Sequence, residues 1–319
     1  MDSFAGRLGV VTGGGTGMGR ELVVQLAAEG CSVALCDVNA DTMAEAAELA
    51  LQGAPAGTKV TTHLCDVADE AQVHAFAAAV VDQHGRDHVN VVFNNAGVGG
   101  GGSFLTGPRE EWDRTFAICW GGVYNVARAF APLLVASDAG HLVNTSSVNG
   151  FWAALGPGIP HTAYSAAKFA VKGFSEALME DFRLHAPHVS VSVVMPGHIG
   201  TDIINNSRKI LAREEPGHDG AQQMRDTMVA RGVPVDGMTD EQLLDMMEMF
   251  GDMFREGAPM TAAAATTFIL DSVKAGKWRI LVGADAVHID QAVRADPENV
   301  YGPNGISLGT ITGAAGLGE

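Results

Sequence analysis

The sequence predicts a doubly wound α/β fold, with a parallel sheet of seven strands between two layers of helices. Seven apolar runs of strand length alternate with longer segments that show helical period, and this alternation continues along nearly all of the 319 residues. Such alternation is typical of parallel sheets, because a helix usually makes the crossover between parallel strands. No change in composition divides the chain, so we expect a single domain over residues 1–302.

The expected strands are short apolar runs that would be buried on both faces of the sheet. In chain order they are Leu8–Thr12, Ser32–Cys36, Val60–Leu64, Asn90–Phe93, His141–Thr145, Ser190–Val194 and Arg279–Val282. The crossovers between them are expected to be right-handed.

The expected helices lie between these runs. The segment Arg20–Glu29 carries Leu22 and Leu26 four residues apart, and Ala68–His84 carries apolar residues at spacings of three and four. Such spacings place side chains on one face of a helix. A further helix is expected to begin at His161.

The composition argues against several classes of protein. Hydrophobic residues make up 47% and charged residues 18%, which predicts a large core and argues against a disordered chain. The net charge is −17, and the 20 Lys and Arg residues form no evident cluster, so we expect neither nucleic-acid binding nor attachment to an anionic membrane. The N-terminus shows no signal peptide, and no uncharged apolar run is long enough to span a bilayer. A cytoplasmic protein is the expectation.

The four cysteines are Cys31, Cys36, Cys65 and Cys119, and no two of them form a Cys-x-x-Cys pair. This spacing predicts neither a structural zinc site nor a disulfide framework. We interpret the cysteines as small core residues in a reducing compartment, and we expect no bound metal.

A glycine-rich turn, Thr-Gly-Gly-Gly-Thr-Gly-Met-Gly at residues 12–19, follows the first strand and leads into a helix. Such a turn lets the backbone approach a pyrophosphate, and the helix N-terminus offers free N–H groups and the positive end of its dipole. A plain tight turn is the alternative, but the strand before and the helix after favour a dinucleotide-binding (Rossmann) unit. The candidate contacts are Gly13, Thr16, Gly17, Met18 and Gly19.

Asp37 lies eighteen residues after Gly19, at the end of the second expected strand. A carboxylate in this position accepts hydrogen bonds from the adenosine ribose hydroxyls and repels a 2′-phosphate. The next residue, Val38, supplies no compensating positive charge. The sequence therefore predicts NAD as the cofactor in preference to NADP, while a helix N-cap or turn residue is the structural alternative for Asp37.

Polar residues also follow the third and fourth expected strands, at the edge of the sheet where ligands bind in open α/β folds. Asp66 is a candidate to hydrogen-bond the adenine ring, and Asn94 is a candidate to tie neighbouring loops together. Ordinary turn residues are the alternative. The candidate cofactor contacts of this region are Asp66, Val67, Asn94, Ala96 and Gly97.

Tyr164 and Lys168 are four residues apart at the start of an expected helix, so they share a face. A free tyrosine with a pKa near ~10 is a poor acid or base at neutral pH, but a nearby ammonium and the charge of a nicotinamide would lower that pKa. A surface pair is the alternative. Ser147 follows the fifth strand, where its hydroxyl can hydrogen-bond a substrate oxygen while the tyrosine transfers a proton.

Together these residues resemble the short-chain dehydrogenase/reductase family, in its common single-domain branch, over roughly residues 5–285. The matching motifs are the glycine turn at 12–19, Asn-Asn-Ala-Gly at 94–97, the Ser-Ser pair ending at Ser147, and Tyr-x-x-x-Lys at 164–168. The resemblance implies that Ser147 is the active-site serine, Tyr164 the catalytic acid/base, and Lys168 both a ribose ligand and the activator of Tyr164. It also implies cofactor contacts at Pro196 and Gly197, with Thr201 at the nicotinamide carboxamide.

Two departures from the family pattern concern the active site. Many members carry an asparagine in the fourth helix that holds a water for proton relay, and here Cys119 occupies that position. The second departure is a longer loop between Ser147 and Tyr164, at residues 151–161, which we expect to line the substrate pocket. The candidate substrate-pocket residues are Asn149, Phe151, Trp152 and His198.

Residues 198–260 are expected to cover the substrate, because the corresponding region does so in the family. Eight of the thirteen methionines lie between Met224 and Met260, and the segment Leu243–Phe254 forms an apolar stripe at helical spacing. The stripe is either core packing against the sheet or an adaptable apolar lid over a bulky substrate. His161 and His198 are interpreted as solvated loop residues, with substrate contact as the alternative.

The expected function is interconversion of a secondary alcohol and its ketone with NAD. An NADPH-dependent ketoreductase and a catalytically weak NAD-binding sensor protein are the alternatives, and Cys119 is the feature that favours the sensor. The resemblance implies a homodimer or homotetramer formed through the helices that carry Cys119 and Tyr164. Residues 303–319 are expected to form a flexible tail or an arm on a neighbouring subunit.

Overall fold

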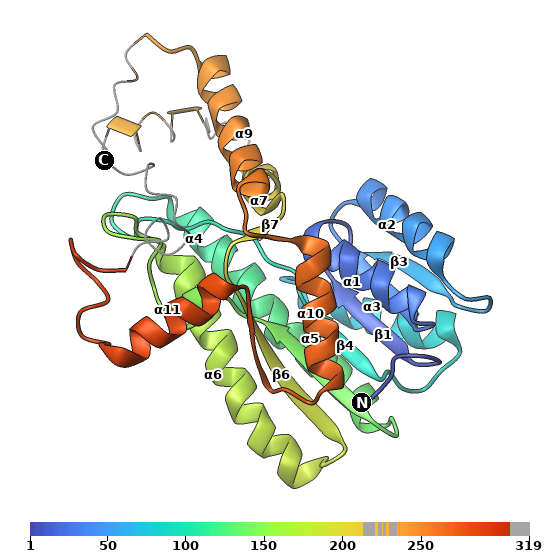
Figure 1. The fold of residues 1–319 in the computed structure, drawn as a ribbon. Coiled ribbons are helices and arrows are strands. Elements are labelled where there is room, and N and C mark those ends of the chain that lie inside the picture. The colour runs from blue at the N-terminus through green and yellow to red at the C-terminus, as the bar shows by residue number, and fades with distance from the viewer. Residues whose placement is uncertain (213–220, 223–224, 226–227, 230–234, 236, 307–319) are drawn as a thin grey trace.

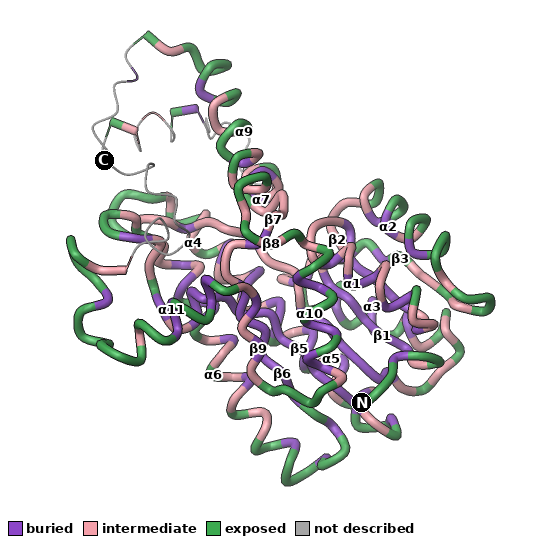
Figure 2. Tube along the Cα trace, in the orientation of Figure 1, coloured by how far each residue is buried: buried purple, intermediate pink, exposed green. Residues whose placement is uncertain are grey.

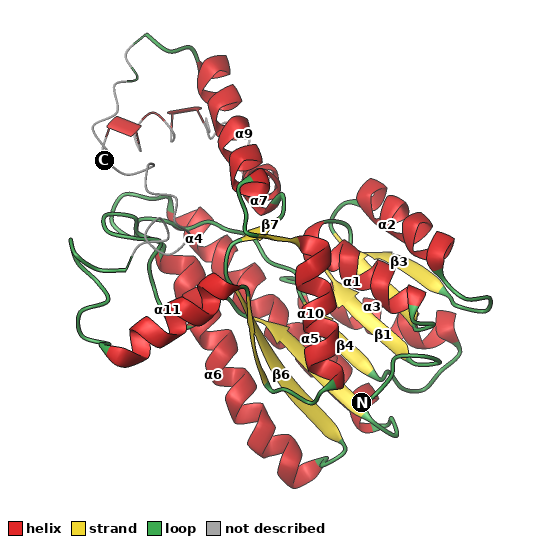
Figure 3. Ribbon diagram, in the orientation of Figure 1, coloured by secondary structure: helices red, strands yellow, loops and turns green. Residues whose placement is uncertain are grey.

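The computed structural model describes residues 1–212, 221–222, 225, 228–229, 235 and 237–306. Within them, seven parallel strands form one sheet in the order β3-β2-β1-β4-β5-β6-β9 (Figures 1 and 3). The strands are β1 (Leu8–Thr12), β2 (Ser32–Asp37), β3 (Val60–Leu64), β4 (Val91–Asn94), β5 (Gly140–Thr145), β6 (Val189–Pro196) and β9 (Arg279–Val282). The doubly wound fold is thus confirmed, and the order of strands reverses between β1 and β4. That reversal opens a crevice at the carboxyl ends of the strands, where ligands bind in such folds.

Helices cover both faces of the sheet. The described helices are α1 (Gly17–Ala28), α2 (Ala40–Gly53), α3 (Glu70–His84), α4 (Arg109–Phe116), α5 (Gly122–Val135), α6 (Thr162–His185), α7 (Ile203–Ala212), α9 (Asp240–Glu256), α10 (Ala262–Lys274) and α11 (Ala284–Ala295). The helix expected at Arg20–Glu29 begins three residues earlier, at Gly17, and the helix expected at Ala68–His84 begins at Glu70, after the N-cap Asp69.

The core consists of two main layers, one on each face of the sheet (Figure 2). Successive strand residues point to opposite faces, so Val10 belongs to the layer under α3, α5 and α6, whereas Val11 belongs to the layer under α1, α2 and α10. Because both faces are covered, the central strands β1 and β4 are mostly apolar and fully buried, whereas the edge strand β3 is more polar and only partly buried.

The chain runs from α4 to α5 without a break, through a π-helical turn at Ala117–Gly121 that contains Cys119. By length and composition, Arg109–Val135 is the one described helical stretch apolar enough to cross a membrane, although Arg128 lies within it. In this fold it is a core helix, because Val126, Phe130 and Leu134 are buried in the layer beneath α5.

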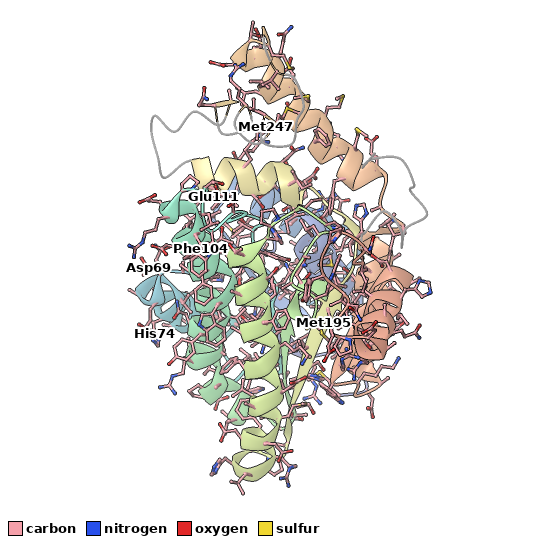
Figure 4. All side chains as sticks on the ribbon, turned by 90° about the vertical axis from the view of Figure 1, so that its left-hand side faces the viewer. Asp69, His74, Phe104, Glu111, Met195 and Met247 are labelled. Atoms are coloured by element: carbon pink, nitrogen blue, oxygen red, sulfur yellow. The ribbon has the colours of Figure 1, made fainter. Side chains whose placement is uncertain are left out.

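The helices α7 and α9 stand at the carboxyl edge of the sheet, and α9 projects away from the body of the molecule (Figure 1). A short two-stranded sheet, β7 (Ile199–Gly200) and β8 (Met260–Thr261), closes the base of this region, and α9 packs on α7. Met247 on α9 lies far from the sheet, whereas Met195 lies within it (Figure 4). The methionine-rich stripe is therefore not packed against the sheet. Met224 and residues 307–319, most of the expected tail, lie outside the described residues.

A buried histidine, His141, and a half-buried one, His84, make the stability of this fold depend on pH. Burial lowers the pKa of His84 and of His141 from 6.5 to about 4, and His141 Nε2 lies 2.7 Å from Ser192 Oγ. Between these two pKa values the unfolded chain binds protons that the folded chain does not, so the free energy of unfolding falls as pH drops from 6.5 towards 4. His141 contributes at most about 3 kcal/mol to that loss.

We expect His141→Gln to flatten the dependence of the unfolding free energy on pH over this window, measured by urea denaturation at several pH values. The exposed His185, replaced in the same way, serves as the control. An unchanged slope in the His141 variant would contradict this account.

Candidate active site

The turn between β1 and α1 depends on glycine at several positions. Gly13 and Gly17 adopt φ values of +64° and +55°, which side chains disfavour. A Cβ on Gly13 would lie 2.9 Å from Ala96 Cα, and a Cβ on Gly19 would lie 1.8 Å from the Gly13 carbonyl oxygen. Gly13 thus lets the loop after β4 approach the turn, and Gly19 lets α1 pack closely on it.

The N-terminus of α1 is open to a ligand. Its N-cap, Thr16, makes no side-chain capping hydrogen bond, and the first turn of α1 contains no acidic residue. The Thr16 hydroxyl instead lies 3.2 Å from Asn206 Nδ2 on α7. Free backbone N–H groups and the positive end of the helix dipole therefore face the cavity beside this turn, as an anionic pyrophosphate requires.

A cavity at the carboxyl edge of the sheet brings most of the predicted cofactor residues together. It is lined by Gly13, Thr16, Gly17, Met18, Asp37, Asp66, Val67, Ala96, Gly97 and Thr201. Six other predicted residues do not line it: Gly19, Asn94, Tyr164, Lys168, Pro196 and Gly197. The glycines, the open helix end and the carboxylate of Asp37 together fit a dinucleotide.

Sequence reasoning missed several residues that line the same cavity. They include Asn39, Thr42, Arg114, Asn206 and Lys209. Asn206 and Lys209 come from α7, in the variable region, where no motif marks them. Arg114 lies on α4, and only the folded structure shows that its side chain reaches the cavity.

Asp37 presents its carboxylate at the end of β2. Oδ1 accepts the Val38 N–H at 2.7 Å, and Oδ2 accepts the Gly15 N–H at 3.0 Å. Burial raises the pKa of Asp37, and the hydrogen bonds from Gly15 and Val38 oppose that rise. A Cβ on Gly15 would meet Thr42 Oγ1 at 2.4 Å, so the turn, Asp37 and α2 are closely packed here.

Asp66 is held by a cation that the sequence analysis did not foresee. Arg114 Nη2 lies 2.6 Å from Asp66 Oδ2, and Asp66 Oδ1 accepts the Ala68 N–H at 3.0 Å. The ion pair joins the loop after β3 to α4. Both residues line the cavity, so the pair forms part of its wall.

The asparagines after β4 hold the edge of the sheet together. Asn94 is buried and donates from Nδ2 to Asn144 Oδ1 at 2.8 Å, which joins β4 to β5. Asn95 donates from Nδ2 to the Thr12 carbonyl at 3.2 Å, and Thr12 Oγ1 accepts the Ala96 N–H at 3.0 Å. Asn94 therefore ties two neighbouring strands together, rather than the loops that the sequence suggested, and it does not line the cavity.

Ser147, Tyr164 and Lys168 meet beside Gly97. A side-chain hydrogen bond joins Tyr164 to Ser147, and Lys168 Nζ lies 5.4 Å from the centroid of the Tyr164 ring. Lys168 is buried and donates from Nζ to the Thr145 carbonyl at 2.9 Å. Nζ also lies 3.5 Å from where a Cβ on Gly97 would stand. The triad thus adjoins the cavity through Gly97, which lines it.

Burial dominates the protonation of this triad. It raises the pKa of Tyr164 above its ordinary value, and the hydrogen bond from Ser147 opposes the rise. Burial also lowers the pKa of Lys168. In the protein alone the pKa of Tyr164 is therefore raised, and the expectation that Lys168 and the charge of a nicotinamide together lower it stays a prediction for the complex. A further positive charge at the site would be needed to make Tyr164 an effective base.

Cys119 sits in the π-helical turn and binds the backbone of the loop after β4. Its thiol donates to the Val98 carbonyl at 3.2 Å and accepts the Val98 N–H at 3.5 Å. The Cys119 thiol and the Lys168 ammonium both lie close to Gly97. A Cβ on Gly97 would stand 3.7 Å from Cys119 Sγ and 3.5 Å from Lys168 Nζ. The side chain is fully buried.

The four predicted substrate-pocket residues have structural contacts instead. Asn149 donates both amide hydrogens to backbone carbonyls, at Trp152 (2.9 Å) and Ala154 (2.8 Å). Trp152 is fully buried against α11, so the expectation that it lines a pocket is wrong. Phe151 is partly buried in the same cluster, and its ring faces the guanidinium of Arg279 at 5.8 Å. The long loop after β5 is thus anchored on α11.

The two loop histidines are partly exposed, and each also makes contacts within the protein. His198 Nε2 lies 2.7 Å from the Phe254 carbonyl at the end of α9, and its ring packs on Phe254 at 4.1 Å. The backbone N–H of His198 donates to Asp285 Oδ2 at 2.6 Å. The ring of His161 packs on Tyr164 at 4.7 Å, and burial lowers the pKa of His161 to about 4. His161 is therefore neutral beside the triad at physiological pH.

Gly197 packs against α11 as well, because a Cβ there would lie 2.1 Å from Asp285 Oδ2. Thr201, by contrast, lies over the glycine turn, 3.3 Å from where a Cβ on Gly17 would stand. Across the described part of the chain, no three His, Cys, Asp or Glu side chains gather in a way that would hold a metal ion.

Residues 8–211 match the family model described as short chain dehydrogenase. The oxidoreductase SadH of Mycobacterium tuberculosis is 33% identical over 294 residues, which are 92% of each chain. Levodione reductase of Leifsonia aquatica is 33% identical over 219 residues, 67% of this chain and 77% of the relative.

Solved structures show the same fold. A short chain dehydrogenase/reductase from Burkholderia phymatum in complex with NAD has a TM-score of 0.75 and 27% identity, over 97% of this chain and 100% of that one. A metagenomic short-chain oxidoreductase in complex with NADP has a TM-score of 0.54 and 33% identity, over 61% of this chain and 83% of that one.

Proposed function

This chain belongs to the short-chain dehydrogenase family of oxidoreductases, and we propose that it interconverts a bulky, apolar or aromatic secondary alcohol and its ketone with NAD. The observation that carries the proposal is the meeting of Ser147, Tyr164 and Lys168 beside Gly97, at the wall of a cavity that fits a dinucleotide. The experiment that tests it is a steady-state assay of NAD reduction with a panel of secondary alcohols.

When bound, NAD accepts the hydrogen and electron pair that leave the alcohol carbon. Tyr164 moves the proton between its phenol oxygen and the substrate oxygen, and Ser147 holds that oxygen by a hydrogen bond. Lys168 keeps its ammonium near the Tyr164 ring because the Thr145 carbonyl fixes Nζ in place. Tyr164 would lose its proton at neutral pH only with a further positive charge beside it, which a cofactor held by the cavity next to Gly97 would supply.

The choice of NAD over NADP rests on Asp37. Two positively charged side chains are among the described residues that line the cavity. They are Arg114, which pairs with Asp66, and Lys209 on α7. Neither is among the residues that directly follow Asp37, because Val38 and Asn39 in those positions are uncharged. A 2′-phosphate would therefore meet the carboxylate of Asp37 without a cation beside it in β2 or its following turn. One neighbouring structure holds NAD and another NADP, so the family alone leaves the choice open.

Cys119 replaces the asparagine that the family pattern places in a proton relay beside the lysine. A thiol is a weak hydrogen-bonding group and holds a water poorly. We expect Cys119→Asn to raise kcat by up to about tenfold, because an amide can bind the Val98 backbone and still support a water near Lys168. The measurement is kcat with NAD and the best alcohol of the panel.

Cys119→Ser serves as the control for loss of the thiol, and circular dichroism reports whether the buried site accepts each variant. A folded Cys119→Asn protein whose kcat equals or falls below that of the wild type would show that the relay does not depend on this position.

An apolar substrate is supported by α7, which lines the cavity, and by α9, which packs on α7. On α7, Ser207 Oγ accepts the Gly99 N–H at 2.7 Å, and Leu211 lies close to Gly100, so α7 covers the glycine-rich loop after β4. On α9, Phe250 and Met253 remain exposed. Flexible methionines and aromatic rings adapt to bulky apolar ligands, so these helices suit such a substrate.

We also propose that the protein is a homodimer or homotetramer through α5 and α6. The rings of Trp120 and Phe174 pack edge to face at 5.4 Å, and Tyr124, which contacts both rings, is exposed. Phe169, also on α6, is exposed as well. An exposed aromatic surface of this kind is typical of a subunit interface. Light scattering after size-exclusion chromatography would measure the number of subunits.

A further inference from the structure

The helix α7 forms one wall of the cofactor cavity. The residues of α7 that line the cavity are Ile203, Asn206, Lys209 and Ile210, and their spacings of three and four place them on one side of the helix. On another side of α7, Ser207 bonds to the loop after β4. The helix is thus held in place, while its first side faces whatever fills the cavity.

Asn206 fixes the direction of the Thr16 hydroxyl. Asn206 Nδ2 lies 3.2 Å from Thr16 Oγ1, and because an amide nitrogen only donates, the Thr16 oxygen is the acceptor in this bond. Thr16 is the N-cap of α1, but its side chain caps no N–H group of that helix. Both residues line the cavity, so the Thr16 hydroxyl hydrogen is left to donate to an acceptor in front of α1.

Lys209 brings a positive charge to the same side of α7, three residues after Asn206. The other cation of the cavity wall, Arg114, pairs with Asp66 at 2.6 Å. Lys209 is exposed, and it makes no ion pair with any acidic side chain that the structure describes. Its ammonium is therefore open to pair with an anion in the cavity.

The rest of the cavity wall is rich in carboxylates, namely those of Asp37, Asp66 and Asp202. Asp66 is neutralised by Arg114 and Asp202 by Arg255, but the whole chain carries a net charge of −17. The pyrophosphate of a dinucleotide is negatively charged, so this field opposes its entry. A cation beside the pyrophosphate would offset that repulsion.

The position of Lys209 indicates which part of a dinucleotide it meets. Asn206 contacts Thr16 at the N-terminus of α1, the part of the cavity that fits a pyrophosphate, whereas Asp37 marks the part that fits the adenosine ribose. Residues three apart on a helix are neighbours on its surface. Lys209 therefore lies beside Asn206, close to the pyrophosphate end of the site.

We propose that α7 binds the pyrophosphate of the dinucleotide through Lys209, whose ammonium pairs with the phosphate oxygens, and through Asn206, which directs the Thr16 hydroxyl towards them. The role of Lys209 rests on the proposed cofactor site, and it adds a binding group outside the glycine turn. Because NAD and NADP share the pyrophosphate, Lys209 supports both cofactors equally, and the choice between them is left to Asp37.

The test measures the dissociation constants of NAD, NADP and adenosine for the wild type, Lys209→Gln and Lys209→Arg by calorimetry. Lys209→Gln should raise the constants for NAD and NADP at least about fivefold and by the same factor, and leave that for adenosine unchanged. Lys209→Arg should keep most of the affinity, because it keeps the charge. Added salt should weaken NAD binding less in Lys209→Gln than in the wild type, since salt screens an exposed ion pair.

Arg208→Gln is the matched control. Arg208 is the neighbouring cation on α7, but it does not line the cavity, and its Nη1 lies 3.5 Å from the Leu244 carbonyl oxygen on α9. Its NAD dissociation constant should stay within about twofold of the wild type. Equal losses in Arg208→Gln and Lys209→Gln would assign the effect to the general charge of α7 and overturn the proposal. A loss confined to NADP would place Lys209 at the 2′-phosphate and also overturn it.

The role of Asn206 is tested in a double-mutant cycle with Thr16. Asn206→Leu and Thr16→Val should each weaken NAD binding, and the double variant should bind NAD no more weakly than Thr16→Val alone, because both changes act through one hydroxyl. Additive losses would overturn the role of Asn206.

The wild-type protein separates a failure of this proposal from a failure of the proposed function. If it binds NAD and Lys209→Gln binds NAD equally well, the cofactor stands and the role of Lys209 is wrong. If the wild type binds neither NAD nor NADP, the proposed function fails, and the role of Lys209 fails with it.

Discussion

Replacement of Tyr164 by phenylalanine is expected to lower kcat by at least about a thousandfold, because it removes the group that exchanges a proton with the substrate oxygen. Phenylalanine keeps the ring that packs on His161 at 4.7 Å and beside Lys168, so the fold and the cofactor cavity should persist. The measurements are kcat with NAD and the best alcohol, and the NAD dissociation constant from fluorescence titration.

Tyr124→Phe is the matched control, since Tyr124 is an exposed tyrosine on α5 away from the triad. Its kcat should stay close to that of the wild type. If Tyr164→Phe retained more than about a tenth of wild-type kcat, another group would have to transfer the proton, and the roles given to Ser147 and Lys168 would fail with it.

Replacement of Asp37 by asparagine is expected to weaken NAD binding about a hundredfold and to narrow the preference for NAD over NADP. The change removes the negative charge and one acceptor oxygen, and hydrogen bonds to charged groups contribute about 1.5–3 kcal/mol each. The remaining amide oxygen can still accept the Val38 N–H, so the end of β2 should keep its shape. The measurement is the ratio of kcat/KM for the two cofactors.

Asp41→Asn supplies the control, because Asp41 is an exposed carboxylate in the first turn of the neighbouring helix α2. Equal losses in the two variants would point to the general negative potential of the region. An unchanged cofactor ratio in Asp37→Asn would remove the basis for choosing NAD.

The fold was predictable because its signal is local. Most strands contain short apolar runs, and Leu8–Thr12, Val60–Leu64 and Arg279–Val282 match the expected ranges residue for residue, although Val60–Leu64 at the sheet edge is only partly buried. The ends of the other strands differ by one or two residues, as at Asn90, where hydrogen bonds from neighbouring elements decide the boundary. The two-stranded sheet β7–β8 was missed because two residues per strand carry no periodicity.

The candidate site was predictable where chemistry and spacing coincide within a few residues, as in the glycine turn and the Tyr164–Lys168 pair. It was not predictable where distant segments meet. Arg114 reaches Asp66 across 48 positions, and Asn206 reaches Thr16 across 190. Trp152 was misplaced because its burial depends on α11, which begins more than a hundred residues later.

The pKa of Tyr164 shows a further limit. Sequence reasoning weighs the charge of Lys168, which favours the phenolate, but it cannot weigh burial, which disfavours it and dominates in this structure. The same holds for His161, whose pKa is lowered by burial and whose ring packs on Tyr164, neither of which its position in the sequence could show.

The measurement that tests the central claim most directly is the formation of reduced nicotinamide, followed by absorbance, when the purified protein meets NAD or NADP and a panel of aromatic, steroidal and aliphatic secondary alcohols. The account predicts turnover with at least one bulky apolar alcohol, with a kcat/KM for NAD that exceeds that for NADP. Turnover that requires NADP would contradict the role of Asp37. Tight NAD binding without turnover across the panel, and without reverse turnover of the matching ketones with reduced NAD, would contradict the proposed reaction and favour a protein that senses the cofactor.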